Sequence, residues 1–150
     1  MKNISILGST GSIGRSTLSV ISLHRDKYNI YAISANQNSE MLLSQCLKWN
    51  PKYAVIYDST KAKWLKEEIN KFDLSTILLI GEEGLNKISS DPSVDIVVAA
   101  IVGSIGLKPC LSAIKSDKKI LLANKESLVM AGNLFMQAVN KSNSSLIPID

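Results

Sequence analysis

Short apolar runs alternate with amphipathic segments along the whole chain, and this alternation constrains the fold more than any other feature. The runs are continuous stretches of Ile, Val, Leu and Ala, which is typical of strands buried on both faces of a parallel sheet. We predict about seven strands, at residues 3–8, 30–34, 53–57, 76–80, 95–100, 119–123 and 145–150. Helices are predicted at residues 12–23, 39–48, 59–70, 82–89, 107–114 and 126–140. This order implies right-handed crossovers and a doubly wound, mainly parallel α/β sheet with helices on both faces. The first helix has an apolar face that we expect to pack on the sheet, formed by Ile13, Thr17, Val20 and Ile21.

The composition fits one globular domain and excludes several other classes of protein. Of the 150 residues, 45% are hydrophobic and 20% are charged, so disordered and collagen-like chains are excluded. Cys46 and Cys110 lack the spacing of a disulfide scaffold or a zinc site, and we expect two buried free thiols. No apolar stretch reaches the ~18 residues of a membrane span, so we expect a cytoplasmic protein without a membrane partner. The lysines behind the net charge of +4 are dispersed, so we expect no nucleic-acid partner.

A glycine-rich loop joins the first predicted strand to the first predicted helix. Gly8, Gly11 and Gly14 can supply a tight turn, a close approach of backbone to phosphate, and a close helix–strand contact. The positive end of the helix dipole favours an anion there. A glycine-rich turn without a ligand is the alternative, but the position between strand and helix favours a Rossmann-like dinucleotide site. The candidate donors to a diphosphate are the backbone N–H groups of Thr10, Ser12 and Ile13.

The turn after the second predicted strand bears on the choice between NAD and NADP. NAD-binding domains usually place Asp or Glu there, for the ribose 2′-hydroxyl. Here the strand runs into Asn36, Gln37 and Asn38. This turn has no carboxylate to repel a 2′-phosphate, and its amides can donate hydrogen bonds to one, although Asn is also common in turns for conformational reasons. The turn therefore favours NADP.

A polar segment, Asn124-Lys125-Glu126, follows the sixth predicted strand at the edge where open α/β sheets bind their ligands. Lys125 offers a point charge to a phosphorylated substrate. Glu126 falls in the first turn of a predicted helix, where the helix dipole favours a carboxylate. Taken alone, the segment is more typical of an ordinary helix start.

Four segments in this order carry a resemblance to a known family. They are residues 8–14 (GSTGSIG), 50–55 (NPKYAV), 122–128 (LANKESL) and 147–150 (IPID). In this combination, essentially the whole chain resembles the N-terminal NADPH-binding domain of the 1-deoxy-D-xylulose 5-phosphate reductoisomerase family. The segment at 122–128 is the most specific part of the resemblance.

By this resemblance, two groups of residues bind the ends of the cofactor. The NADPH diphosphate would be held by Thr10, Gly11, Ser12 and Ile13. The adenosine 2′-phosphate would be met by Asn36, Gln37 and Asn38. The family usually has a lysine where Gln37 stands, so this chain has one positive charge fewer at the 2′-phosphate.

The resemblance also implies residues around the reacting groups. Asn124 and Glu126 would lie against the cofactor, and Lys125 would contact the substrate. Asp150 matches the first acid of the family's Asp-Ser-Glu motif, which binds Mg²⁺ or Mn²⁺. A divalent ion takes several oxygen ligands, which one carboxylate does not supply.

The activity implied by the resemblance is the isomerisation and NADPH-dependent reduction of 1-deoxy-D-xylulose 5-phosphate to 2-C-methyl-D-erythritol 4-phosphate, a step of non-mevalonate isoprenoid biosynthesis. The full-length enzyme is expected to be a homodimer. Residues 1–150 lack the family's catalytic and C-terminal domains, so we expect this chain to be part of a longer one and to bind cofactor without turnover.

Two alternative functions stay open. One is another NADP-dependent dehydrogenase, such as one acting on a semialdehyde, which its substrate would distinguish. The other is a non-catalytic nucleotide-binding module, which hydride transfer would exclude.

Overall fold

The computed structural model describes residues 1–123 and 125–149, and only the backbone of residues 125–131. One sheet contains all the strands of this part of the chain, and helices connect them. The strands are β1 (Lys2–Leu7), β2 (Tyr28–Ala35), β3 (Tyr53–Ile56), β4 (Ile77–Ile80), β5 (Ile96–Ala99), β6 (Lys119–Leu122) and β7 (Ser145–Pro148). The helices are α1 (Ser12–Ser22), α2 (Ser39–Trp49), α3 (Ala62–Lys71), α4 (Gly81–Ser90), α5 (Leu107–Lys115) and α6 (Lys125–Asn140), with 3₁₀ turns η1 (Ser59–Lys61) and η2 (Ser104–Gly106).

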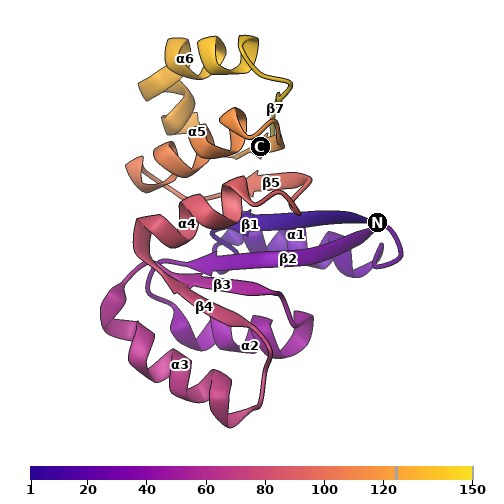
Figure 1. Cartoon of the computed structure of the whole chain (residues 1–150), viewed down its shortest axis with the longest axis vertical. Helices are drawn as coiled ribbons and strands as arrows, with labels where there is room; N and C mark the ends of the chain where they lie inside the picture. Colours follow the sequence, from indigo (N-terminus) through magenta and orange to yellow (C-terminus); the bar gives the residue numbers. More distant parts are fainter. Residues whose placement is uncertain (124, 150) are drawn as a thin grey trace.

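The sheet has the order β4-β3-β2-β1-β5-β6-β7, and every neighbouring pair is parallel. In Figure 1 the strands follow this order from β4 at the bottom towards β7 at the top. The chain winds outward from β1 to β4, crosses back over the sheet through α4, and continues outward again from β5. The strand order therefore reverses at β1 and β5, whose carboxyl ends form the topological switch point. The predicted doubly wound parallel sheet is confirmed.

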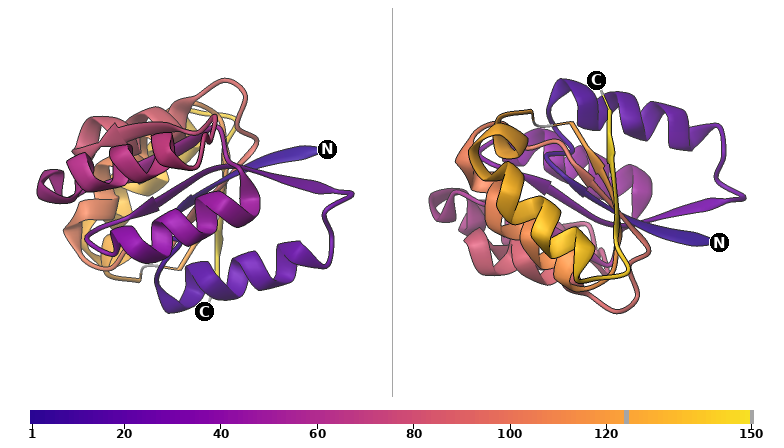
Figure 2. Two further views of the ribbon diagram at one scale, coloured as in Figure 1. Left: turned by 90° about the horizontal axis from the view of Figure 1, so that it is seen from below. Right: turned by 90° about the horizontal axis from the view of Figure 1, so that it is seen from above.

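Two hydrophobic cores fill the two faces of the sheet. One core packs α1, α2 and α3 on the strands, with Leu18, Leu42 and Leu65 among its members. The other packs α4, α5 and α6, with Ile88 and Ile114 fully buried. Figure 2 shows the consequence, with α1 and α6 on opposite sides of the strands. No helix of the described residues is both long and apolar enough to cross a membrane.

The face of α1 that packs on the sheet agrees with the predicted one except at Val20. The buried residues are Gly14, Leu18 and Ile21, Ile13 and Thr17 are half-buried, and Val20 is 59% exposed. The reason is the contact at Gly14, where a Cβ would lie 2.1 Å from the carbonyl oxygen of Gly8. This contact turns the Gly14 side of the helix inward, and the apolar pattern alone does not reveal it.

The outer strand β4 is also less buried than predicted. Ile77 and Ile80 are 48% and 47% exposed, although their run of apolar residues indicated burial on both faces. An edge strand has a neighbour on one side only, so part of each side chain remains open to solvent. The two cysteines follow the prediction. Cys46 and Cys110 are free and buried, and burial raises the pKa of both thiols to about 12.

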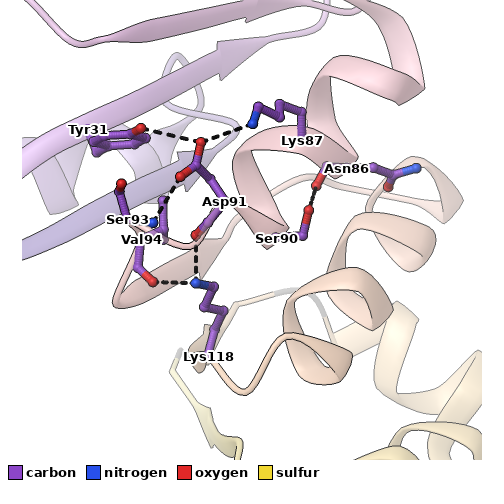
Figure 3. A network of polar contacts seen from close by, with 8 residues as sticks. All are labelled: Tyr31, Asn86, Lys87, Ser90, Asp91, Ser93, Val94 and Lys118. Atoms are coloured by element: carbon purple, nitrogen blue, oxygen red, sulfur yellow. Dashed lines mark hydrogen bonds and ion pairs between the residues drawn. The ribbon is translucent and has the colours of Figure 1, made fainter.

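A network of hydrogen bonds and an ion pair lies at the amino ends of the strands, away from the switch point (Figure 3). The Lys118 ammonium donates to the carbonyl oxygens of Asp91 and Val94, both at 2.6 Å. The Asp91 carboxylate accepts from the Ser93 N–H at 2.9 Å and pairs with Lys87 at 3.3 Å. Desolvation alone would raise the pKa of Asp91, but these partners outweigh it and hold the pKa below its ordinary value. The network ties α4 to the starts of β5 and β6, so β5, one of the two strands at the switch point, is held at its amino end.

Candidate functional site

The glycine-rich loop between β1 and α1 has backbone geometry that only glycine fits at two of its three glycine positions. Gly8 has φ of +86°, and a Cβ there would lie 2.8 Å from the carbonyl oxygen of Ala100. At Gly14 a Cβ would lie 2.1 Å from the Gly8 carbonyl oxygen and 2.6 Å from the Ser9 Cα. A Cβ on Gly11 meets only the Gly8 carbonyl oxygen, at 3.7 Å. The protein itself therefore does not require glycine at Gly11, which leaves room for the close approach of a ligand.

The glycine-rich loop leads into the N-terminus of α1, where backbone N–H groups of the first helical turn are free to donate. Gly11 is the N-cap, no side chain caps the helix, and its first turn contains no acidic residue. The N–H groups of the first turn have no partner within a helix, so they are available to an anion. The Arg15 Nε donates to the Gly11 carbonyl oxygen at 3.4 Å, which adds a cation beside the loop.

A pocket opens at the switch point between this loop and the ends of β2, β3 and β5. Its lining includes Gly11, Asn36, Tyr57, Leu85, Val102 and Ile105. It is mainly apolar, and its empty volume of about 560 Å³ includes the open solvent at its mouth. An apolar pocket with a few backbone donors on one wall is typical of a cofactor site.

A second pocket lies on the other side of the loop that follows β5. It shares Gly11 and Val102 with the first pocket and adds Ser12, Ile13 and Ala123. The two pockets therefore flank the glycine-rich loop, one towards β2 and β3 and the other towards β6. A dinucleotide needs this arrangement, because its diphosphate lies between two groups that require separate pockets.

The predicted 2′-phosphate turn is exposed at the carboxyl end of β2. Asn36, Gln37 and Asn38 are all exposed. The Oδ1 of Asn38 accepts from the Met41 N–H at 3.1 Å and so caps α2, which leaves its Nδ2 as the remaining donor.

An acidic residue reaches this turn from the neighbouring strand. The Asp58 N–H, just after β3, donates to the Asn36 carbonyl oxygen at 2.9 Å. The Thr60 hydroxyl and N–H donate to the Asp58 carboxylate, and these bonds lower its pKa. The turn at 36–38 has no acid of its own, but the fold places an ionised one beside it.

The predicted residues near the reaction centre fall partly outside the described structure. Asn124 and Asp150 lie outside the described residues. Lys125 and Glu126 begin α6, and their side chains are not among those described. Within the described residues, no group of three or more His, Cys, Asp or Glu side chains could hold a metal ion. The predicted metal and substrate contacts therefore remain predictions.

The structure adds residues that the sequence patterns did not single out. Tyr57, Leu85 and Ile105 line the first pocket from the end of β3, from α4 and from η2. Gln45 of α2 is buried and bonds to the glycine-rich loop. Residue spacing does not reveal them, because they are brought together by strand order rather than by a local motif. The available signal for Gln45 was a polar side chain three residues after Leu42 and next to Cys46, both apolar, in a predicted helix.

Comparison with known proteins identifies the family. The model of the 1-deoxy-D-xylulose 5-phosphate reductoisomerase family matches residues 4–132. A protein of that name from Pseudomonas fluorescens is 49% identical over 150 residues, which are 100% of this chain and 38% of the relative. The chain thus spans less than two fifths of the length of this relative.

Solved structures agree. A crystal structure of DOX-P reductoisomerase in complex with NADPH, fosmidomycin and magnesium has a TM-score of 0.97 and 42% identity, covering 100% of this chain and 36% of that one. A putative homoserine dehydrogenase from Archaeoglobus fulgidus has a TM-score of 0.62 at 16% identity, covering 99% of this chain and 42% of that one, which shows a shared fold alone. The family match, the identity and the switch-point loop agree, and the chain belongs to the 1-deoxy-D-xylulose 5-phosphate reductoisomerase family.

Proposed function

We propose that this chain is the NADPH-binding part of a 1-deoxy-D-xylulose 5-phosphate reductoisomerase. One observation carries the proposal. The N-terminus of α1 has no side-chain cap, and the glycine-rich loop that leads into it lies between two pockets at the switch point. The whole protein would isomerise 1-deoxy-D-xylulose 5-phosphate and reduce the product to 2-C-methyl-D-erythritol 4-phosphate, with NADPH supplying the hydride when bound.

The diphosphate is assigned to the glycine-rich loop and the first turn of α1. The N–H groups of Thr10, Ser12 and Ile13 would donate to its oxygens, and the helix dipole would stabilise its negative charge. The Gly11 N–H already donates to the Gly8 carbonyl oxygen at 3.3 Å, so Gly11 would contribute by letting the backbone approach the diphosphate closely. In this reading the adenine lies in the pocket lined by Tyr57 and Ile105. The 2′-phosphate would lie at the turn that follows β2, formed by Asn36, Gln37 and Asn38.

The nicotinamide end is assigned to the second pocket, beside Ile13, Val102 and Ala123. Its lining is mostly apolar, which would exclude water and hold the ring in one orientation. We place Asn124 and Glu126 against the cofactor and Lys125 against the phosphorylated substrate. Asp150 would contribute to an Mg²⁺ or Mn²⁺ site whose other oxygen ligands come from the rest of the protein.

Activity of the full-length protein tests the proposal. With 1-deoxy-D-xylulose 5-phosphate and Mg²⁺ or Mn²⁺, the full-length protein should oxidise NADPH, whereas the 150-residue chain should not. Asp150→Ala in the full-length protein should abolish turnover while NADPH binding stays within about twofold of the unchanged protein. Oxidation of NADPH only with a semialdehyde substrate would refute the proposed reaction. Full activity of Asp150→Ala would refute the metal assignment.

Two further properties of the whole protein belong to the same proposal. Cys46 and Cys110 are free thiols, which suits a reducing compartment, and we propose the cytoplasm. We also propose a homodimer, which light scattering on the full-length protein would test. A monomer at micromolar concentration would contradict this assembly.

A further inference from the structure

Three buried polar side chains lie directly beneath the glycine-rich loop. Ser9 has no exposed surface, Ser34 is 1% exposed and Gln45 is 8% exposed. They come from the loop itself, from β2 and from α2. Buried polar side chains are costly unless their hydrogen bonds are satisfied, so a cluster of three calls for a physical reason.

Gln45 holds Ser9 through two hydrogen bonds at once. Its Nε2 donates to the Ser9 carbonyl oxygen at 2.9 Å, and its Oε1 accepts from the Ser9 hydroxyl at 2.6 Å. The orientation of the amide is fixed, because a carbonyl oxygen only accepts and the atom facing it must be the NH₂ group. The Ser9 Oγ also lies 3.1 Å from the Ser34 carbonyl oxygen, but a hydroxyl has a single proton, and the shorter contact with Gln45 takes it.

Two backbone N–H groups of the loop, those of Gly8 and Ser9, are tied to β2. The Ser9 N–H donates to the Ser34 carbonyl oxygen at 2.8 Å. The Gly8 N–H donates to the Ser34 Oγ at 2.8 Å. Both backbone polar groups of Ser9 are therefore satisfied inside the protein. The donors left for a ligand begin at the next residue, Thr10.

This arrangement fixes the peptide groups that face the pocket. Ser9 is held by Gln45 on one side and by Ser34 on another, and α1 packs on its Cα at the Gly14 contact. A loop fixed in its binding geometry loses less entropy when an anion binds. Gln45 lines neither of the two pockets at the switch point, so its effect on a ligand would pass through Ser9.

We propose that Gln45 is a positioning residue for the diphosphate loop, setting NADPH affinity through its two hydrogen bonds to Ser9 without contacting the cofactor. The inference rests on the proposed NADPH function. The proposed cofactor site is otherwise built from strand ends and α1. Gln45, which lies in α2 and 36 residues after Ser9 in the sequence, would add an indirect contribution to NADPH affinity.

The test compares two ligands on Gln45→Met, which keeps the length of the side chain and removes both hydrogen bonds. NADPH carries the diphosphate, whereas 2′-AMP carries adenosine and a 2′-phosphate without one. By calorimetry, Gln45→Met should bind NADPH about tenfold more weakly and 2′-AMP within about twofold of the unchanged chain. Gln137→Met, the same change at an exposed position of α6, is the matched control and should change neither. Equal losses for both ligands would indicate a general structural role and overturn the proposal.

Gln45→Glu gives a signature that packing alone would not produce. Its carboxylate can accept from the Ser9 hydroxyl, but it opposes the Ser9 carbonyl oxygen. The protonated acid regains a donor to that carbonyl. The NADPH affinity of Gln45→Glu, divided by that of the unchanged chain at each pH, should therefore rise as the pH falls from 8 to 5.5, because burial raises the pKa of a carboxyl group. The ratio cancels titration of the 2′-phosphate, and a flat ratio would contradict the proposal.

A third measurement needs no ligand. Hydrogen exchange at the Gly8 and Ser9 amides, which both donate to Ser34, should be about tenfold faster in Gln45→Met, with the amides of β6 unchanged. Unchanged exchange at both loop amides would overturn the role of Gln45 in holding the loop.

If the unchanged chain does not bind NADPH, the proposed function fails, but the exchange measurement still decides whether Gln45 holds the loop. If Gln45→Met does not fold, Ser9→Ala takes its place, because it removes only the hydroxyl bond and should weaken NADPH more than 2′-AMP.

Discussion

An added methyl group should separate the roles of Gly11 and Gly14, which are three residues apart. In Gly14→Ala the new Cβ would lie 2.1 Å from the Gly8 carbonyl oxygen and 2.6 Å from the Ser9 Cα. Both are backbone atoms, so no side-chain rotation relieves the overlap and α1 must move away from the loop. Overpacking of this kind costs about 1–3 kcal/mol, and the better helix propensity of Ala returns up to about 1 kcal/mol. Because backbone meets backbone here, we expect a net loss of about 2 kcal/mol.

In Gly11→Ala the Cβ meets a single atom at 3.7 Å, which is ordinary contact, and the φ of −78° suits any residue. The free energy of unfolding should fall by no more than about 1 kcal/mol, the usual cost of a poor N-cap such as Ala. The methyl group occupies the space where the diphosphate is expected, so NADPH affinity should fall at least about tenfold, or about 1.4 kcal/mol.

Thermal unfolding and calorimetry together measure the contrast. Gly14→Ala should lower the Tm by about 4–8 °C, at about 2–4 °C per kcal/mol for a chain of this length. Gly11→Ala should keep the Tm within about 3 °C and lower the NADPH affinity at least about tenfold. A Gly11→Ala protein with unchanged NADPH affinity would refute the diphosphate assignment, and an unchanged Tm in Gly14→Ala would refute the packing account.

Three further predictions concern charge. Gln37→Lys should raise the preference for NADPH over NADH about two- to fivefold at low salt, measured by calorimetry, because it restores a cation at the 2′-phosphate turn. Asp58→Asn keeps the cap of η1 but removes an ionised group beside Asn36, so it should strengthen NADPH binding about twofold at low salt and leave NADH unchanged. In urea titrations, Asp91→Asn should lower the free energy of unfolding by about 1–2 kcal/mol at pH 7. The pKa of Asp91 lies below its ordinary value of 3.8 in the folded state, so this stabilisation is present above pH 3.8 and is lost as the pH falls through the folded pKa, where variant and parent should converge.

The strands and their doubly wound parallel sheet were predictable because each parallel strand carries its own signal. Runs such as 53–57 and 95–100 are apolar along their whole length, and the intervening segments are amphipathic, so a doubly wound sheet follows from general rules. The same reasoning wrongly predicted that Ile77 and Ile80 are buried. A buried strand and an edge strand have similar residues, and only the completed strand order shows which one lacks a neighbour.

The candidate site was predictable where a local motif carries it. Gly8 and Gly14 have the turn and packing geometry that the motif predicts. Asp58 and Gln45 were not predictable in the same way, because each acts on a segment more than twenty residues away. Their positions depend on how β3 and α2 pack beside β2. The ligand contacts proposed for Thr10 to Ile13 and Asn36 to Asn38 remain predictions.

The most direct test of the proposed cofactor site is a calorimetric titration of the 150-residue chain with NADPH and, separately, with NADH. We expect one NADPH per chain, bound more tightly than NADH, with the difference in affinity decreasing as salt screens the 2′-phosphate. Absence of NADPH binding by the folded chain, or tighter binding of NADH, would contradict the proposed site.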